Sequence, residues 1–241
     1  MSKTDTAVLI TAYNEERNIS DLLESIGEKY DVFVVDDGST DRTVEICRQK
    51  GARVIKSPMN MGQGAAAVMG YKVVAAEGYE QVIKMDGDGQ HDPAEIPAFI
   101  VKLEESGADK VVGSRVLGSD YQGAPLARRL FLRPLTHVLN LITGYKLTDS
   151  MCGYRAFRGS SLIKMVDVFD EIQELEYIAS EMWIRLAQAG FKVEEVPVKL
   201  AKRKSGFSYK GLYRYAWGVI STIVRARLDI SRKKTSDRRE S

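Results

Sequence analysis

The chain has 241 residues, 44% of them hydrophobic, which is enough to bury one sizeable α/β core. Its 35 Lys and Arg residues nearly balance 33 Asp and Glu residues, so the net charge of +2 excludes a globally basic nucleic-acid-binding protein. The two cysteines, Cys47 and Cys152, lie far apart, which indicates neither a zinc site nor a disulfide framework. No apolar signal segment stands among the polar residues 1–5, so we expect a cytoplasmic protein.

Short apolar runs alternate with segments of helical period along the first half of the chain. The runs predict buried strands at Ala7–Thr11, Asp31–Val35, Arg53–Ile55, Gln81–Met85 and Lys110–Val112. This alternation predicts a single α/β domain, in which a mostly parallel central sheet is flanked by the crossover helices.

Cap signals place two helices along the chain. The run Asp92-Pro93-Ala94-Glu95 predicts a helix that begins immediately after Asp92, because it combines an N-cap, a proline at the first helical position and a capping glutamate. A second helix is expected over Glu176–Ala189, closed by Gly190 and followed by an alternating strand, Lys192–Val198.

The C-terminal region differs from the rest of the chain in pattern. Apolar residues at helical spacing predict an amphipathic helix over residues 211–230, and the polar residues 231–241 predict a disordered tail. The uncharged stretch Tyr215–Val224 is too short to span a bilayer. Two interpretations stay open for this helix: it lies at a membrane surface, or it packs on the domain or a second subunit.

Polar clusters follow three of the predicted strands. They are Thr11–Glu16 after the first strand, Asp36–Asp41 after the second and Asp86–Asp92 after the fourth. In open α/β sheets, ligands bind beyond the carboxyl ends of the strands. We therefore expect these clusters to share one edge of the sheet and to form the functional site there.

The cluster after the fourth strand has the composition of a cation site. Asp86, Asp88 and Gln90 offer oxygen ligands at alternate positions, while Gly87 and Gly89 let the backbone turn sharply. Mg²⁺ or Mn²⁺ held by such oxygens keeps open positions for a diphosphate. The alternative is that the Asp and Gly residues only form a turn after the strand.

Two further features suit a nucleotide but have simpler explanations. One of the adjacent carboxylates Asp36 and Asp37 could bind a ribose or a base, whereas a helix-capping turn also explains Asp36–Asp41. Gly62-Gln63-Gly64 opens a helix over Ala65–Ala76, whose free N–H groups could face an anion, although tight packing also favours glycine there.

Taken together, these motifs resemble the family 2 glycosyltransferases of GT-A (Rossmann-like) fold, and among them the dolichyl-phosphate mannose synthases and related polyprenyl-phosphate sugar transferases. The resemblance covers Ala7–Lys210, within an expected catalytic domain of residues 1–210, and its four main motifs are Thr11–Glu16, Val35–Asp41, Asn60–Gly64 and Asp86–Pro93. Weaker motifs point to the lipid-phosphate branch of the family: Gly113–Arg115, the Arg128–Arg129 pair, Cys152–Arg155 and Arg203–Ser208.

The resemblance implies a role for individual residues. The nucleotide-sugar is expected at Thr11, Tyr13, Glu15, Asp37, Gly64, Asp86 and Gln90, and Mg²⁺ or Mn²⁺ at Asp86, Asp88 and Gln90. The acceptor phosphate is expected at Arg115, Arg128, Arg129 and Arg203, because guanidinium groups bind phosphate oxygens in pairs. Asp88, Arg115 and Arg203 are then the catalytic residues. For Arg128 and Arg129, a solvated helix face is an equally good explanation.

Three positions depart from the family pattern. Thr11-Ala12 stands where a proline is usual, and Gln63 stands where a lysine is frequent between the two glycines. The last motif of the family commonly ends Gly-X-Ser-Lys, whereas here Tyr209 separates Ser208 from Lys210.

The expected chemistry depends on the acceptor. A polyprenyl phosphate is already anionic, so it can displace the nucleoside diphosphate directly, with inversion and without a strong base. A hydroxyl acceptor would instead need a base, for which Asp149 and Glu176 are candidates. A catalytically silent nucleotide-binding membrane subunit or a nucleotidyltransferase would also fit these motifs. We expect the protein at the cytosolic membrane face, bound to the membrane surface or a membrane partner and able to form a homo-oligomer.

Overall fold

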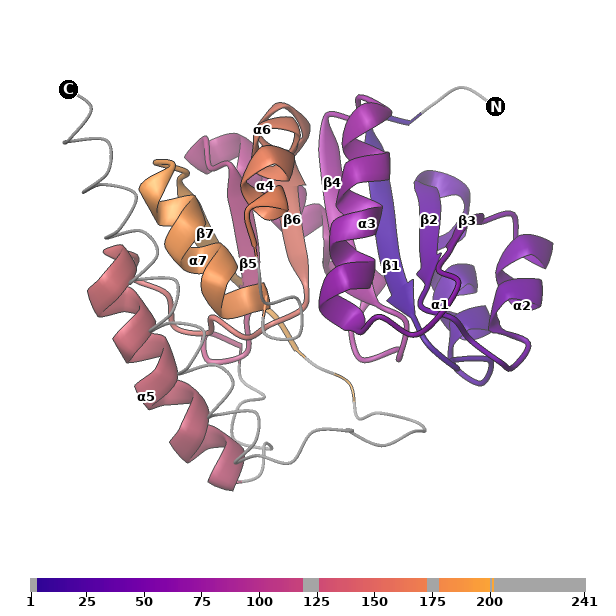
Figure 1. Ribbon diagram of the computed structural model, residues 1–241, viewed down its shortest axis with the longest axis horizontal. Helices are drawn as coiled ribbons and strands as arrows, with labels where there is room; N and C mark the ends of the chain where they lie inside the picture. Colours follow the sequence, from indigo (N-terminus) through magenta and orange to yellow (C-terminus); the bar gives the residue numbers. More distant parts are fainter. Residues whose placement is uncertain (1–3, 119–125, 173–177, 200, 202–241) are drawn as a thin grey trace.

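The computed structural model of the chain describes residues 4–118, 126–172, 178–199 and 201 (Figure 1). Within these ranges, it describes the side chains of all residues except 126–132 and 178–180. The predicted C-terminal helix and tail, residues 211–241, lie outside the described residues.

A seven-stranded sheet in the order β3-β2-β1-β4-β6-β5-β7 forms the centre of the molecule. Its strands are β1 (Thr6–Ala12), β2 (Asp31–Asp36), β3 (Arg53–Lys56), β4 (Gln81–Asp86), β5 (Lys110–Ser114), β6 (Arg155–Arg158) and β7 (Val193–Pro197). All neighbouring strands are parallel except β6, which runs antiparallel to both β4 and β5. The predicted α/β class with a mostly parallel sheet is confirmed.

Strand β6 was not predicted from the sequence. Its four residues, Arg-Ala-Phe-Arg, have a charged residue at each end and no apolar run. The other six predicted strands are present, with ends that differ from the prediction by one or two residues.

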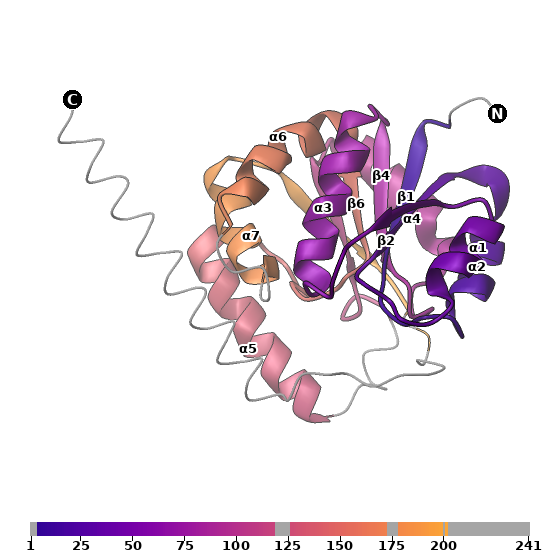
Figure 2. The ribbon, with the colours of Figure 1, turned by 45° about the vertical axis from the view of Figure 1, so that its right-hand side comes forward.

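Helices cover both faces of the sheet (Figures 1 and 2). Helices α3, α6 and α7 lie on one face and α1, α2 and α4 on the other, while α5 packs against α7 at the flank. Their bounds are α1 (Ile19–Ile26), α2 (Thr43–Gln49), α3 (Gln63–Ala76), α4 (Ile96–Ser106), α5 (Leu126–Thr143), α6 (Gly159–Asp170) and α7 (Ile178–Gln188), with single 3₁₀ turns η1 (Gly27–Lys29) and η2 (Pro93–Glu95). None of these helices is both long and apolar enough to cross a lipid bilayer.

The sequence explains how helices α1 and α3 pack. Helix α1 buries Ile19, Leu22, Leu23 and Ile26, whose spacing places them on one face. Helix α3 approaches the sheet closely at Gly70, where an added Cβ would lie 2.7 Å from side-chain atoms of Leu9 and Val35. Small residues in α3 thus fix the distance between this helix and the strands that lead into the site.

The cap signals at Asp92 and Gly190 lie where the sequence predicts them, but the first turn after Asp92 is a 3₁₀ turn and not an α-helical one. Asp92 Oδ1 accepts a hydrogen bond of 2.9 Å from Ala94 N, as expected for an N-cap, but the first turn is the 3₁₀ turn η2, and α4 follows it. Gly190 ends the segment after α7 with a φ of 77°, as the C-cap prediction requires. The predicted start of this helix, at Glu176, lies outside the described residues.

Candidate active site at the carboxyl edge of the sheet

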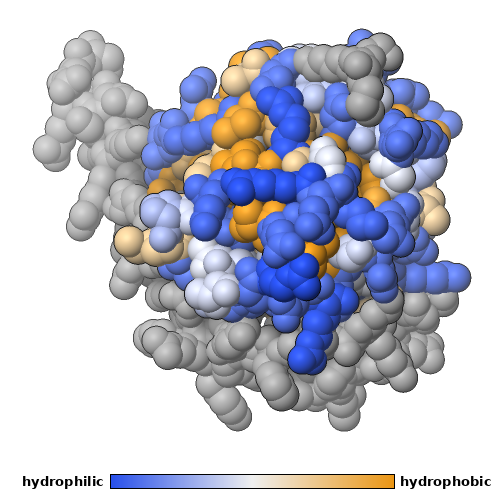
Figure 3. Space-filling view, turned by 90° about the vertical axis from the view of Figure 1, so that its right-hand side faces the viewer, coloured by the Kyte–Doolittle hydropathy of each residue, from blue (hydrophilic) through white to orange (hydrophobic). Residues whose placement is uncertain are grey.

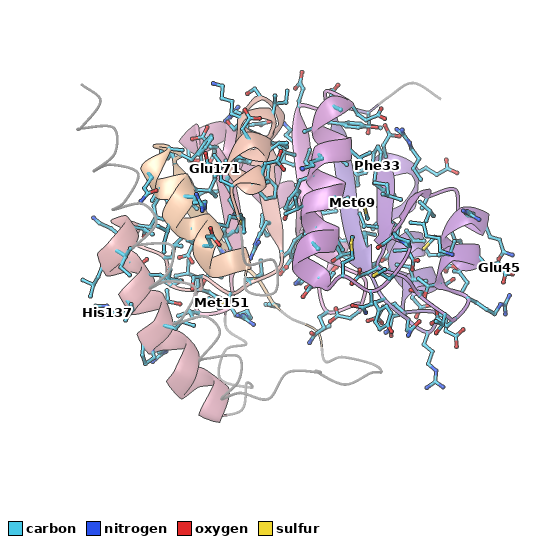
Figure 4. All side chains as sticks on the ribbon, in the orientation of Figure 1. Phe33, Glu45, Met69, His137, Met151 and Glu171 are labelled. Carbon is cyan, nitrogen blue, oxygen red and sulfur yellow. The ribbon has the colours of Figure 1, made fainter. Side chains whose placement is uncertain are left out.

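The three polar clusters meet at one edge of the sheet, as predicted. Strands β2, β1 and β4 are parallel neighbours, and the last residues of the strands stand in register: Ala12 with Asp36, and Thr11 with Asp86. A hydrogen bond of 3.4 Å joins Thr11 Oγ1 to Asp86 Oδ1. In the orientation of Figure 4, this edge is the lower one, where Met151 is labelled in the loop before β6.

The loops after β1 and β2 are interlocked by hydrogen bonds. Asn14 N donates to Ser39 Oγ (2.9 Å), and Thr40 N donates to Asn14 Oδ1 (2.9 Å). Glu15 N donates to Thr43 Oγ1 (2.8 Å). Asn14 has a φ of 55°, which is uncommon for a residue other than glycine, and these contacts hold it there. The two loops therefore form one rigid wall of the site.

The nucleotide residues that the resemblance implies differ in exposure. Glu15 is buried and its carboxylate accepts a hydrogen bond from Asn18 Nδ2 (2.5 Å), while Tyr13 beside it is half-buried. Thr11 is buried at the end of β1, and Gly64 is buried in the first turn of α3. Tyr13 is thus more exposed than Thr11, Glu15 and Gly64.

The adjacent carboxylates after β2 accept backbone hydrogen bonds. Asp37 accepts from Met61 N (2.8 Å) and Gly62 N (2.9 Å), and Asp36 accepts from Ser39 N (3.2 Å). Burial raises the pKa of Asp37, and the two N–H donors offset part of that effect. Both carboxylates therefore have structural partners, and Asp37 ties the loop before α3 to the end of β2.

The same loop has a strict requirement at Gly38. This residue has a φ of 77°, and a Cβ there would lie 2.7 Å from the carbonyl carbon of Met59. Close to it, Asp41 Oδ1 accepts from Thr43 N (3.0 Å) at the start of α2, as the capping interpretation predicts.

The surface on the side of α1 and α2 presents mostly hydrophilic groups, with hydrophobic side chains visible between them (Figure 3).

Asp86 is the anchor of the acidic loop. Its Oδ1 forms an ion pair with the buried Lys84 and accepts from Gln63 Nε2 (2.6 Å). An added Cβ at Gly153 would lie 2.5 Å from Asp86 Oδ2. The loop before β6 can therefore approach Asp86 this closely only with a glycine at position 153. Burial alone would raise the pKa of Asp86, but the Lys84 ammonium and the hydrogen bonds hold it well below its usual value. Asp86 is therefore ionised at neutral pH.

His91 completes the turn of the acidic loop as a neutral acceptor. Asp86 N donates to His91 Nδ1 (3.0 Å), and the imidazole stacks on the Tyr154 ring with centroids 4.8 Å apart. Burial lowers the pKa of His91 to about 4. The unprotonated Nδ1 that this pKa implies is the form that accepts a hydrogen bond.

Asp88 and Gln90 lie on the same turn and offer oxygen atoms. Gln90 N donates to Asp88 Oδ1 (3.0 Å), Gln90 Nε2 donates to Ala201 O (3.3 Å), and Ala201 N donates to Gln90 O (2.9 Å). Among the described residues, no group of three or more His, Cys, Asp and Glu is placed to hold a metal ion. The predicted set has two carboxylates and one amide, a donor set that suits Mg²⁺ or Mn²⁺.

Arg115 is held by a carboxylate on the far side of the site. Its Nε and a terminal nitrogen donate to the two oxygens of Asp149 at 2.5 and 2.7 Å, in a bidentate pair. Glu195 of β7 in turn accepts from Asp149 N (2.9 Å) and from Thr148 N and Oγ1 (both 2.8 Å). Burial raises the pKa of Glu195, and the hydrogen bonds act in the opposite direction. This chain of contacts fixes the direction of the Arg115 guanidinium.

Several predicted residues cannot be placed, and several residues were missed. The side chains of Arg128 and Arg129 in α5 are not described, and Glu176, Arg203 and Lys210 lie outside the described residues. The sequence motifs gave no role to Lys84, His91, Arg155 or Glu195. Charged residues within otherwise apolar strands were the available signal for Lys84 and Glu195.

Comparison with known proteins identifies the family. The profile of "Glycosyl transferase family 2" matches residues 7–166. The chain belongs to glycosyltransferase family 2. This glycosyltransferase is 30% identical to the UDP-N-acetylglucosamine–dolichyl-phosphate N-acetylglucosaminyltransferase of Methanococcus voltae, over 80% of its own length and 84% of the relative. It is 28% identical to the polyprenol monophosphomannose synthase of Mycolicibacterium smegmatis, over 92% of its length and 90% of the relative.

A solved structure confirms that the glycosyltransferase has the GT-A-like fold. Glucosyl-3-phosphoglycerate synthase from Mycobacterium tuberculosis, in complex with Mn²⁺, UDP and glucosyl-3-phosphoglycerate, superposes with a TM-score of 0.64. The alignment covers 93% of the glycosyltransferase and 80% of that chain, at 21% identity. At this identity the likeness concerns the fold alone.

Proposed function

We propose that this glycosyltransferase transfers a sugar from a nucleotide diphosphate donor, GDP-mannose or a UDP-sugar, to a polyprenyl phosphate such as dolichyl phosphate, with inversion. The observation that carries the proposal is the rigid Arg115–Asp149 pair, at the same sheet edge as the acidic loop of Asp86 and Asp88. Relatives named for transfer to dolichyl or polyprenyl phosphate align over 80% and 92% of the chain, which supports it.

The residues divide the task between donor and acceptor. Asp86, Asp88 and Gln90 would hold Mg²⁺ or Mn²⁺, which neutralises charge on the departing nucleoside diphosphate. The wall around Tyr13 and Asp37 positions the nucleotide. Arg115, fixed by Asp149, orients the acceptor phosphate, whose oxygen attacks the anomeric carbon while the bond to the diphosphate breaks. No protein base is needed, because the phosphate oxygen is already anionic.

A hydroxyl acceptor fits this geometry less well. Such an acceptor needs a base near the sugar, and Asp149 is the described candidate. Its two oxygens already accept hydrogen bonds from Arg115 and from Met151 N (3.2 Å), so the carboxylate is committed to holding the guanidinium. A catalytically silent subunit would retain nucleotide binding without any transfer or donor hydrolysis.

The acceptor requires contact with a lipid surface. We propose that the enzyme works peripherally at the cytosolic membrane face, through residues 211–230 or a membrane partner, because polyprenyl phosphates are held in membranes. Sedimentation of the full-length protein with anionic vesicles, compared with a chain that ends at residue 210, tests this part separately.

The central test is the replacement of Asp88 by Asn or Ala. With Mn²⁺, labelled nucleotide-sugars and a short-chain polyprenyl phosphate, we expect the wild type to form a lipid-phosphate sugar and Asp88→Ala to lose at least about 10²-fold in kcat. Asp167→Asn, an exposed carboxylate on α6, is the control and is expected to keep wild-type kcat. Retained metal-dependent turnover in Asp88→Ala contradicts the site assignment. Transfer to free sugars but not to the lipid phosphate contradicts the acceptor.

A further inference from the structure

Two basic side chains lie next to each other in the sheet behind the acidic loop. Lys84 of β4 and Arg155 of β6 are register partners in the antiparallel pairing, so their side chains leave the sheet on the same face. They are 3% and 8% exposed. Lys84 is neutralised by its ion pair with Asp86. Among the described residues, no carboxylate lies within ion-pair distance of Arg155, whose Nε donates to Cys152 O (3.0 Å).

The uncompensated charge of Arg155 is unusual because arginine cannot become neutral. A buried charge without a counter-ion is costly, whereas a buried lysine can lose its proton. Lys110 on the neighbouring strand shows the second case: it is fully buried, lies 3.9 Å from the Trp183 ring centroid, and burial lowers its pKa well below the usual value. Arg155 has no such escape, and its guanidinium is farther from that ring, at 6.0 Å. Its position therefore favours a ligand that supplies the missing negative charge.

The location of Arg155 fits a substrate phosphate. It begins β6, directly after the loop whose Gly153 packs against Asp86, so it stands at the carboxyl edge of β4 and β5. The register pair Val112–Arg155 places it on the strand next to β5, which ends one residue before Arg115. The residue as a whole keeps 8% of its surface exposed.

We propose that Arg155 binds a phosphate group of the substrates, as a second guanidinium beside Arg115. The proposal rests on the proposed function for the identity of that group, which is the donor diphosphate or the acceptor phosphomonoester. Both present anionic oxygens that match a guanidinium fork. The contact of Arg155 with Cys152 O leaves its terminal nitrogens to donate to those oxygens.

The test compares two arginines of the same strand. Arg155→Met removes the charge and keeps much of the volume, and Arg155→Lys keeps the charge without the fork. Arg158→Met is the matched control, because Arg158 donates to Leu103 O (2.7 Å) and Ala108 O (3.3 Å), at the opposite end of β6 from the site. Calorimetry of the full-length proteins with Mn²⁺ measures Kd for UDP or GDP against the nucleoside, and for a short-chain prenyl phosphate against the prenol.

We expect Arg155→Met to weaken one phosphate-bearing probe by about tenfold or more, since a charge-assisted hydrogen bond is lost, without change for its dephosphorylated counterpart. Loss for the nucleotide assigns the donor diphosphate, and loss for the prenyl phosphate assigns the acceptor. The Kd of Arg155→Lys is expected to lie between the values for Arg155→Met and the wild type. The Kd of Arg158→Met is expected to equal that of the wild type. Should Arg155→Met fail to fold, the Arg155→Lys variant carries the measurement, with a loss of about threefold expected.

The result that overturns the proposal is a Kd within twofold of wild type for both phosphate probes in folded Arg155 variants. This outcome is distinct from failure of the proposed function. If the wild type transfers sugar to lipid phosphate while the Arg155 variants bind normally, only the role of Arg155 is wrong. If phosphate binding depends on Arg155 but no lipid-linked sugar forms, the role of Arg155 stands and the proposed acceptor is wrong.

Discussion

Two sets of carboxylates at the site, the Asp36–Asp37 pair and Asp149, are held by different kinds of partner. On the side built from β1 to β4 with their loops, called the donor side here after the proposed function, Asp36 and Asp37 accept hydrogen bonds from backbone N–H groups. On the side built from β5 to β7, called the acceptor side in the same sense, Asp149 is paired with the guanidinium of Arg115. Backbone donors carry no net charge, whereas the guanidinium carries a full one.

The kind of partner decides which part of the structure keeps each carboxylate in place. A carboxylate held by backbone N–H groups depends on the course of the loop, so loop geometry is its weak point. A carboxylate in a buried ion pair depends on one partner side chain, and removing that partner leaves a buried charge. The Asp36–Asp37 turn is therefore most sensitive to changes of backbone, and the Arg115–Asp149 pair to changes of charge.

The largest effect is expected from breaking the buried pair on the acceptor side. Asp149→Ala removes the bidentate partner of Arg115, whose side chain is 12% exposed against 2% for Asp149, and should lower the free energy of unfolding by about 3–5 kcal/mol. Glu45→Ala breaks the Arg42–Glu45 ion pair, which is exposed at both ends, and should leave the free energy of unfolding close to that of the wild type. Urea denaturation measures both, and equal losses would remove the distinction between the pairs.

A smaller effect is expected from the donor-side backbone. Gly38→Ala places a Cβ against the Met59 backbone at a φ of 77° and should cost about 2–3 kcal/mol. Gly51→Ala has a similar φ of 78° but nothing within 4 Å of the added atom, so it should cost about 1 kcal/mol. The extra loss of stability in Gly38→Ala over Gly51→Ala measures the contact of position 38 with the Met59 backbone. Equal losses in the two variants would show that the loop shifts to make room for the added Cβ.

A third expected effect is the pH dependence of stability contributed by Lys110. Burial lowers its pKa below 10.5 in the native state, so the unfolded chain binds a proton that the native protein does not. Stability should therefore rise with pH, by up to about 1.4 kcal/mol per unit, between the native pKa and 10.5, and reach its full value above 10.5. Lys110→Met should abolish this slope, measured by urea denaturation from pH 6 to 9.

The control for this change is Lys164→Met, an exposed lysine of α6, which should leave the slope as in wild type. A native Lys110 that stays protonated against the Trp183 ring would give Lys110→Met and wild-type proteins the same slope. That result would contradict the assignment of Lys110 as a neutral amine.

The donor side was the easier half to predict from the sequence. Strands β1 and β4 are parallel and buried, so they appear as apolar runs, and the polar clusters with Asp86-Gly87-Asp88 and Asp36-Asp37 follow directly after β4 and β2. What the sequence could not show is that Asp37 reaches the backbone of Met61 and Gly62, because that contact joins residues 24 and 25 positions apart.

The acceptor side was predicted less completely, for a physical reason. Strand β6 has four residues with arginine at both ends, and it pairs with strands that lie far from it in sequence, so no local pattern reveals it. The pairing of Asp149 with Arg115 and the support from Glu195 likewise depend on tertiary contacts. The candidate base at Asp149 was identified, but the sequence did not indicate that the carboxylate is already occupied.

The support that Glu195 gives to Asp149 has a consequence for synthesis of the protein. Their hydrogen bond joins residues 46 positions apart, and Glu195 belongs to β7, the last strand of the sheet. Domains emerge from the ribosome with their N-terminal part first. A nascent chain that stops short of residue 195 therefore contains every strand of the donor side, β1 to β4, while its Arg115 clamp still lacks the strand that steadies it.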